Sequence, residues 1–109
     1  MKPSLGRTVY CIYEDLILVE TVYMVGKDSF LIDSFGSATK EDSWEWYYDQ
    51  YNVTWFTSLA RAKKAIMKSD IAKHYVRPVL VKVIDYDQYH YYELREKEVE
   101  KPKWTTVNT

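Results

Sequence analysis

The sequence is poor in residues that support thiol or metal chemistry. Cys11 is the only cysteine among 109 residues, which excludes an intrachain disulfide and a site built from several thiolates. His74 and His90 are far from Cys11 in sequence and are not spaced as paired ligands. We therefore expect no metal ion, no cofactor and an inert thiol at Cys11, which lies in the apolar run VYCIY.

Glycine is also scarce, with three residues, and this limits the loop motifs that the chain can form. The chain has no glycine-rich loop to cradle a phosphate and no Gly-x-Ser-x-Gly elbow to present a nucleophile. The sixteen acidic residues do not single out a catalytic pair. We therefore predict that the protein is not an enzyme and has no catalytic residues.

Long apolar runs are missing too. No run approaches the roughly 20 residues that a membrane-spanning helix needs, and the longest candidate, residues 16–19, has the length of a strand. The first ten residues, MKPSLGRTVY, lack the apolar segment of a signal peptide. We expect no membrane association and a cytoplasmic location.

Aromatic residues, by contrast, are abundant. They make up 17% of the chain, with eleven tyrosines and four tryptophans, which is more than a core of this size must bury. Tyrosine and tryptophan combine a large apolar area with a polar tip. The surplus fits an interaction surface, and it fits equally a sheet with aromatic cross-strand pairs.

The chain is organised around residues 44–67, where a strand pattern gives way to a helix pattern. WEWYYDQYNVTWF alternates with period two and predicts a hairpin whose strands, 44–48 and 53–56, flank a turn at 49–52. TSLARAKKAIM then predicts a helix of about a dozen residues capped by Thr57 or Ser58. Its apolar stripe comprises Leu59, Ala62 and Ile66, with Ala65 beside it.

The whole pattern predicts a single domain of α+β class, spanning residues 1–109. We expect a small, strongly bent antiparallel sheet of about six or seven strands with one packed helix. An SH3-like barrel with the helix across one end is favoured, and an open sheet with the helix on one face is the alternative. The strands are expected at residues 7–13, 16–25, 29–35, 44–48, 53–56, 79–86 and 90–100.

Three further expectations concern irregular backbone. The second strand should bend or bulge near its polar Glu20-Thr21 pair, as strands of small barrels do. The loop at residues 36–43 should be mobile. Residues 1–6 and 100–109 should be flexible, with Trp104 the only group able to dock the tail.

The net charge of −1 conceals a partition between two parts of the chain. Residues 58–82 carry seven Lys or Arg and one Asp, and Arg61, Lys64 and Lys68 share one face of the predicted helix. These three cations could hold phosphates, so a single-stranded nucleic-acid-binding protein is the alternative functional interpretation. A helix that carries lysines only for solvation is the simpler interpretation, because the whole protein is not basic.

Residues 14–57 carry nine acids and two bases, and many of the acids are interleaved with aromatic residues. Acidic aromatic surfaces suit basic protein partners, including proteins whose DNA channel they can occupy. Core packing is the simpler interpretation for Trp44 and Trp46. The candidate protein-binding residues are Glu41, Asp42, Glu45, Tyr47, Asp49 and Tyr51.

The run VYMVGKDSFLIDSF followed by YDQYNVTWFTSLARAKKAI resembles small uncharacterised proteins of phages and Gram-positive mobile elements. The resemblance covers residues 7–84 at most, and its motif is structural, with Trp55 and Phe56 as core and Ser58 as cap. It implies a short barrel and no particular activity. Small phage proteins of this size include inhibitors of host defence systems such as anti-CRISPRs, which act in the cytoplasm of the host cell.

We therefore expect a non-enzymatic protein-binding module, in its narrower form a phage-derived inhibitor of a host protein. It would act through the acidic aromatic residues on a basic partner surface. The alternative is single-stranded nucleic-acid binding through the predicted helix. A small enzyme or a structural virion component is a third interpretation, with less support.

Overall fold

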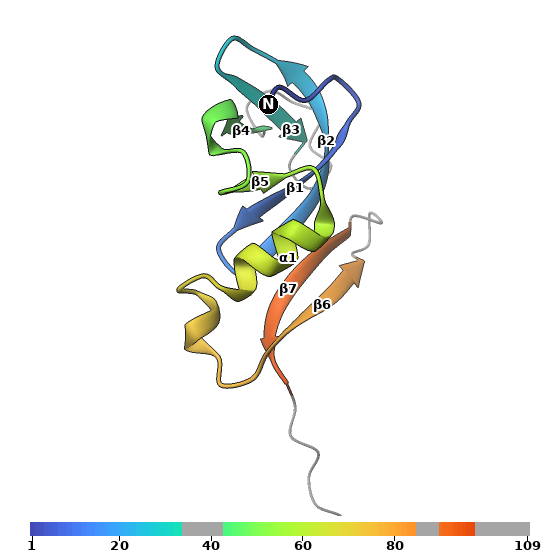
Figure 1. The fold of residues 1–109 in the computed structure, drawn as a ribbon. Helices are drawn as coiled ribbons and strands as arrows, with labels where there is room; N and C mark the ends of the chain where they lie inside the picture. The colour runs from blue at the N-terminus through green and yellow to red at the C-terminus, as the bar shows by residue number, and fades with distance from the viewer. Residues whose placement is uncertain (34–42, 85–89, 98–109) are drawn as a thin grey trace, which may run out of the picture.

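A computed structural model describes residues 1–33, 43–84 and 90–97 (Figure 1). It confirms the α+β class, with seven strands and one α-helix, α1 (Leu59–Met67), in the described part of the chain. The described residues also form two 3₁₀ helices, η3 (Tyr48–Gln50) and η4 (Ala72–His74). The strands are β1 (Thr8–Tyr13), β2 (Leu16–Val25), β3 (Ser29–Asp33), β4 (Ser43–Tyr47), β5 (Trp55–Phe56), β6 (Pro78–Ile84) and β7 (His90–Glu96).

Some sequence predictions fall outside the described residues. These are residues 36–42 of the predicted loop, the ends of three predicted strands (34–35, 85–86 and 98–100), the tail at residues 100–109 with Trp104, and the candidate binding residues Glu41 and Asp42. Ser43, predicted as the last loop residue, instead begins β4.

Strand β2 is ten residues long and pairs with three other strands. One of its edges pairs with β1, while the other pairs with β7 at residues 16–18 and with β3 at residues 22–25. The register with β3 shifts between Val22 and Met24, so the bulge expected in this strand is confirmed. A bulge bends a strand and increases its twist, which lets β2 serve two different partners along one edge.

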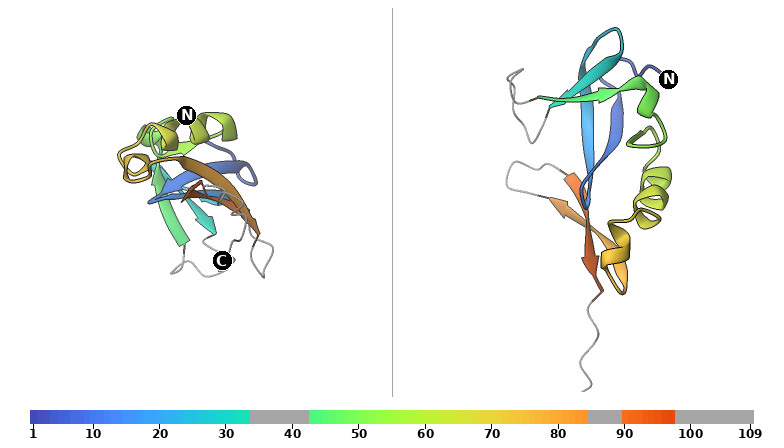
Figure 2. Two further views of the ribbon diagram at one scale, coloured as in Figure 1. Left: turned by 90° about the horizontal axis from the view of Figure 1, so that it is seen from below. Right: turned by 90° about the vertical axis from the view of Figure 1, so that its left-hand side faces the viewer.

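The result is a strongly curled antiparallel sheet in the form of a half barrel. Its strand order is β4-β3-β2-β1-β5, and the β6–β7 hairpin joins through β2. In the described residues no ladder pairs β4 with β5, so the sheet stays open there. Helix α1 lies along one side of the sheet, beside β1 and β5 (Figure 2).

Two hydrophobic cores lie on opposite faces of the sheet, because alternate residues of β1 and β2 point to opposite sides. The first core is Val9, Cys11, Leu18, Val22, Phe30, Ile32 and Trp55, with Trp44 and Trp46 packed against it. The second lies under α1 and consists of Ile17, Phe56, Ala62, Ile66, Ala72 and Leu94. The core role predicted for the two tryptophans of β4 is therefore confirmed, although both rings are only half-buried.

Helix α1 docks through the predicted apolar stripe. Ala62 and Ile66 are fully buried, and Leu59 and Ala65 pack against the same core. The helix begins after Ser58, whose hydroxyl oxygen accepts a hydrogen bond from the main-chain N–H of Arg61 at 3.4 Å. It is nine residues long, shorter than expected. In the part of the chain that the structure describes, no helix has the length and apolarity needed to cross a membrane.

The predicted hairpin of residues 44–48 and 53–56 is wrong. Strand β4 pairs with β3, with Tyr47 opposite Ser29, and β5 pairs with β1, with Trp55 opposite Cys11. Between β4 and β5 the chain turns through η3 and through Asn52, whose φ is +65°. This route carries Trp55 into the first core, where its side chain is fully buried.

Candidate functional site

The exposed side of β4 carries one group of the predicted binding residues. Alternation along the strand turns Trp44 and Trp46 inward and leaves Glu45 and Tyr47 outside, and half of Tyr47 is exposed. The Tyr47 hydroxyl donates to one Glu45 carboxylate oxygen at 3.2 Å, and the Ser29 hydroxyl donates to the other. The negative charge of Glu45 and this hydrogen bond raise the pKa of Tyr47.

Beside this group is a hollow of about 260 Å³ lined by Asp28, Tyr47, Tyr48 and Asp49. The β3–β4 register brings Asp28 here, because it places the neighbouring Ser29 opposite Tyr47. Tyr48 is fixed by two bonds: its main-chain N–H donates to the Asp28 carbonyl oxygen at 3.0 Å, and its hydroxyl donates to the Gly26 carbonyl oxygen at 2.8 Å. Two carboxylates and two phenol rings therefore share one concave surface.

We call Asp28, Glu45, Tyr47, Tyr48 and Asp49 the acidic aromatic face. Sequence reasoning missed Asp28 and Tyr48. Asp28 lies between the strands predicted at residues 16–25 and 29–35, and only the β3–β4 pairing shows that it lies beside Tyr47.

The predicted site residue Tyr51 lies apart from this face. Its ring packs on Trp55 with 4.7 Å between the ring centroids, and its hydroxyl shares a hydrogen bond with the Thr57 hydroxyl at 3.0 Å. Tyr51 is half-buried and packs against the first core. The structure thus brings together Glu45, Tyr47 and Asp49, and it places Tyr51 in a packing position.

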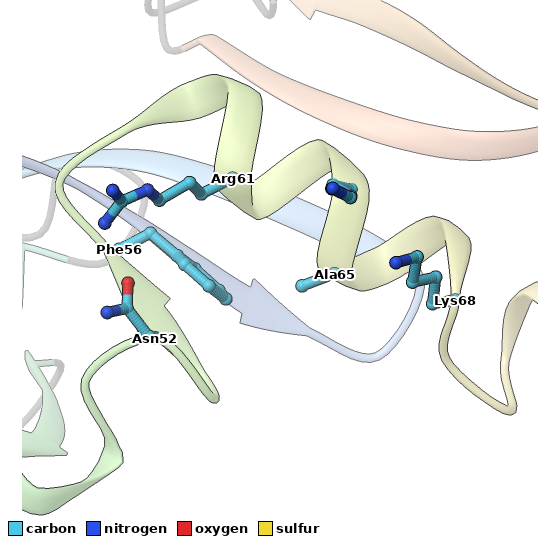
Figure 3. Close-up of a pocket in the computed structure, with 6 residues that line it drawn as sticks. Asn52, Phe56, Arg61, Ala65 and Lys68 are labelled. Carbon is cyan, nitrogen blue, oxygen red and sulfur yellow. The ribbon is translucent and has the colours of Figure 1, made fainter.

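A second concave surface lies along α1 (Figure 3). It has a volume of about 330 Å³, and we call it the α1 groove. Arg61 extends towards Phe56 and Asn52, and Lys68 lies further along the helix, beyond Ala65 (Figure 3). The groove is lined by Asn52, Phe56, Arg61, Lys64, Ala65 and Lys68.

The three cations of the α1 groove are the residues of the alternative nucleic-acid prediction, and the structure does bring them together. Asn52 and Phe56 were not expected there, because they come from the turn and strand that precede the helix. Phe56 is only 2% exposed, so it closes the groove from below without presenting an open ring face. Lys63 points elsewhere, with its ammonium group 4.6 Å from the centre of the Tyr92 ring.

Within residues 1–33, 43–84 and 90–97, the groove cations make no ion pair. Other cations in this part of the chain do find carboxylates: Lys73 pairs with Asp70 at 3.0 Å, and Arg95 pairs with Glu93 at 2.6 Å. No acidic residue lines the groove. Its electrostatic character is therefore uniformly positive.

The thiol lies in the first core, as its apolar sequence context predicts. Cys11 is fully buried, and burial together with the nearby Glu20 carboxylate raises its pKa well above the ordinary value. His74 and His90 are exposed on separate elements, η4 and β7. Among the described residues, no group of three or more His, Cys, Asp or Glu side chains is arranged to hold a metal ion.

Comparison with known proteins identifies no relative: no family model, no curated protein and no solved structure matches this chain. The function is therefore argued from the acidic aromatic face and the α1 groove.

Proposed function

We propose that this protein is a non-enzymatic binding module whose acidic aromatic face binds a basic surface of another protein. The observation that carries the proposal is the hollow between Asp28, Tyr47, Tyr48 and Asp49. Tyrosine is enriched in interface cores because it buries a large area at low cost in side-chain entropy. Carboxylates beside it attract a basic partner and fix its register.

The composition of the hollow suits a lysine or arginine side chain. Faces of phenol rings attract cations, and carboxylates form charge-assisted hydrogen bonds with them. The chain itself provides an example, because the Lys2 ammonium group lies 5.4 Å from the centre of the Tyr48 ring. A basic side chain of a partner would meet the half-exposed Tyr47 and two carboxylates in the same place.

We propose a narrower form as well, which rests only on the resemblance of the sequence to small phage proteins. In that form the protein is an inhibitor, acting in the cytoplasm of a bacterial host, that covers a basic surface of a defence protein. A surface that normally binds nucleic acid is the kind that an acidic protein can occupy.

The test compares two charge-reversed variants with the parent protein. Glu45→Lys combined with Asp49→Lys inverts the acidic aromatic face, while Arg61→Glu, Lys64→Glu and Lys68→Glu together invert the α1 groove. Each tagged protein is used for capture from a host lysate, and the Kd of the captured, purified partner is then measured by calorimetry. Circular dichroism spectra matching that of the parent show that the variants are folded.

We expect the acidic-face variant to lose the partner and the groove variant to keep it. Capture that survives in the first and fails in the second would contradict the proposal. Capture that resists both changes would locate the interface elsewhere on the molecule.

The alternative function, single-stranded nucleic-acid binding, is supported by the three cations of the α1 groove, which form no ion pair within the described residues. It has less support because non-specific binders of single strands also stack bases on exposed rings, and Phe56 is 2% exposed. We therefore expect no salt-sensitive binding of single- or double-stranded oligonucleotides at near-physiological ionic strength.

A further inference from the structure

The α1 groove concentrates positive charge without compensating it. Arg61, Lys64 and Lys68 carry three charges around about 330 Å³, and no acidic side chain from residues 1–33, 43–84 or 90–97 lines the volume. Like charges held close together repel one another, and an anion between them removes that repulsion. Outside the groove, Lys73 and Arg95 form ion pairs with Asp70 and Glu93, so carboxylate partners are used elsewhere on this protein.

The arrangement of the donors fits a short anion. Residues 61, 64 and 68 share one face of the helix, and at about 1.5 Å rise per residue they span roughly 10 Å along its axis. Arg61 reaches towards Asn52, so a guanidinium group and a carboxamide meet at one end of the groove (Figure 3). A guanidinium fork matches the oxygens of a phosphate group, and lysines add point charges beside it.

The rest of the lining is apolar. The Phe56 ring and the Ala65 methyl group lie between the cationic groups (Figure 3). A ligand held by charge alone would not require an apolar surface between the cations. The combination suits a molecule with a phosphate group and a compact ring or sugar, since small-molecule sites pair an apolar lining with a few placed polar groups.

Acidic residues lie close in sequence to both ends of the groove. Asp49, part of the acidic aromatic face, comes three positions before Asn52, and Asp70 follows Lys68 by two positions with 94% of its side chain exposed. Asp70 and Lys73 together add no net charge at that end. A strand that continued past the groove would therefore leave the positive region, and Phe56 would offer its bases no exposed ring face.

We propose that the α1 groove is a binding site for a small phosphate-bearing molecule, of the nucleotide or sugar-phosphate class. Arg61, Lys64 and Lys68 hold one or two phosphate groups, Asn52 adds a hydrogen bond, and Ala65 contacts the apolar part, beside the buried Phe56 ring. The volume is at the lower end of the range of about 300–1,000 Å³ typical of ligand pockets. This site is independent of the acidic aromatic face.

The experiment is a titration of the ¹⁵N-labelled protein, followed by NMR, with inorganic phosphate, AMP and ADP in about 150 mM salt. We expect ADP to shift the signals of the Asn52 side-chain amide, the Arg61 Nε–H and the backbone amides of residues 61–68. Binding should be saturable, and ADP should bind about tenfold more tightly than inorganic phosphate. The Arg61→Gln and Lys64→Gln double variant should weaken ADP binding at least about tenfold.

The matched control is the double variant Lys63→Gln and Lys73→Gln, which removes the same charge from the same region but outside the groove. It should bind ADP as the parent does. Equal weakening in both double variants would show a merely solvated basic helix and overturn the proposal, as would the absence of shifts at millimolar ADP.

An oligothymidylate is titrated as well, to test single-strand binding. Affinity that exceeds that of ADP and grows with strand length would overturn the small-ligand proposal in favour of single-strand binding. Amide spectra of each variant are recorded first. If the Arg61→Gln and Lys64→Gln double variant is unfolded, Arg61→Lys, which keeps the charge, replaces it. Arg61→Lys should retain binding of inorganic phosphate and weaken that of ADP.

Discussion

The indole N–H of Trp55 donates a hydrogen bond to the main-chain carbonyl oxygen of Tyr47 at 2.7 Å. This bond joins the two open ends of the half barrel, because Trp55 belongs to β5 and Tyr47 ends β4. Trp55 is fully buried between Phe30 and Tyr51, with ring centroids 4.8 Å and 4.7 Å away. The exposed Tyr47 is therefore anchored to the first core through its backbone.

Trp55→Phe should destabilise the fold measurably. The substitution keeps an aromatic ring but removes the donor, which leaves the Tyr47 carbonyl oxygen without its partner. We expect the free energy of unfolding to fall by about 1–3 kcal/mol beyond the loss of ring volume. Chemical denaturation followed by circular dichroism measures the change.

Trp46→Phe is the matched control, because the Trp46 indole N–H is buried without a hydrogen-bond partner in the described residues. The same atoms are removed, but no hydrogen bond is lost and an unsatisfied donor disappears. Trp46→Phe should therefore cost clearly less than Trp55→Phe. Equal losses for the two would show that the Trp55–Tyr47 bond adds nothing to stability.

Ile66→Asp should be among the most damaging substitutions on α1. Ile66 is fully buried in the second core, and an unpaired carboxylate there would have to be desolvated. We expect a loss of several kcal/mol or failure to fold, whereas Lys64→Asp, on the exposed side, should change stability little. The urea unfolding midpoints of the two variants measure these losses, and similar losses would contradict the docking of α1 through Ile66.

The Cys11 thiol should react slowly in the native protein. It is fully buried, and its raised pKa keeps it protonated, whereas the thiolate is the reactive form. A thiol reagent at neutral pH should label it at a rate limited by unfolding and should label it rapidly in denaturant. Fast labelling of the native protein would indicate an accessible or activated thiol.

The same thiol predicts a pH dependence of stability. In the unfolded chain it loses its proton near its ordinary pKa of about 8.5, while in the folded protein it does so at higher pH. Its contribution to the free energy of unfolding is therefore constant below about pH 8 and falls as the pH rises above the ordinary thiol pKa. Thermal midpoints at rising pH should fall less steeply for Cys11→Ala than for the parent, and parallel curves would contradict this.

Local features of the fold were predictable from sequence because their causes are local. The cap at Ser58 depends on residues within one helical turn, and the burial of Ile66 follows from helical spacing. The strand bounds of β1 and β2 follow from alternation, and the bulge follows from a polar pair in a long strand. These signals show which face a residue occupies.

They do not show which strand lies next to it. Alternation in residues 44–56 predicts a hairpin, but β4 pairs with β3 instead. Strand β5 pairs with β1, and the paired residues are more than 40 positions apart in sequence. The candidate sites were incompletely predicted for the same reason. Asp28 and Asn52 lie at turns, and only the pairing of the strands around them brings one to Tyr47 and the other to Arg61.

In the acidic aromatic face, the charged residues should affect mainly association and the aromatic residues mainly dissociation. Under the proposed function, Asp49 lies at a solvent-exposed position and steers the approach of a basic partner, so Asp49→Asn should lower the association rate constant and weaken its salt dependence. Tyr47 is half-exposed and becomes buried on binding, so Tyr47→Ala should raise the dissociation rate constant, with a loss of about 1–3 kcal/mol.

Surface plasmon resonance with the purified partner, repeated over a range of salt concentrations, separates the two rate constants. Val76→Ala is the control, because Val76 is 86% exposed and lies outside the acidic aromatic face. It should leave both rate constants unchanged. If Asp49→Asn changed only the dissociation rate constant and Tyr47→Ala changed neither, the partner would not be using this face as proposed, because rim charges act mainly on association and buried aromatic anchors mainly on dissociation.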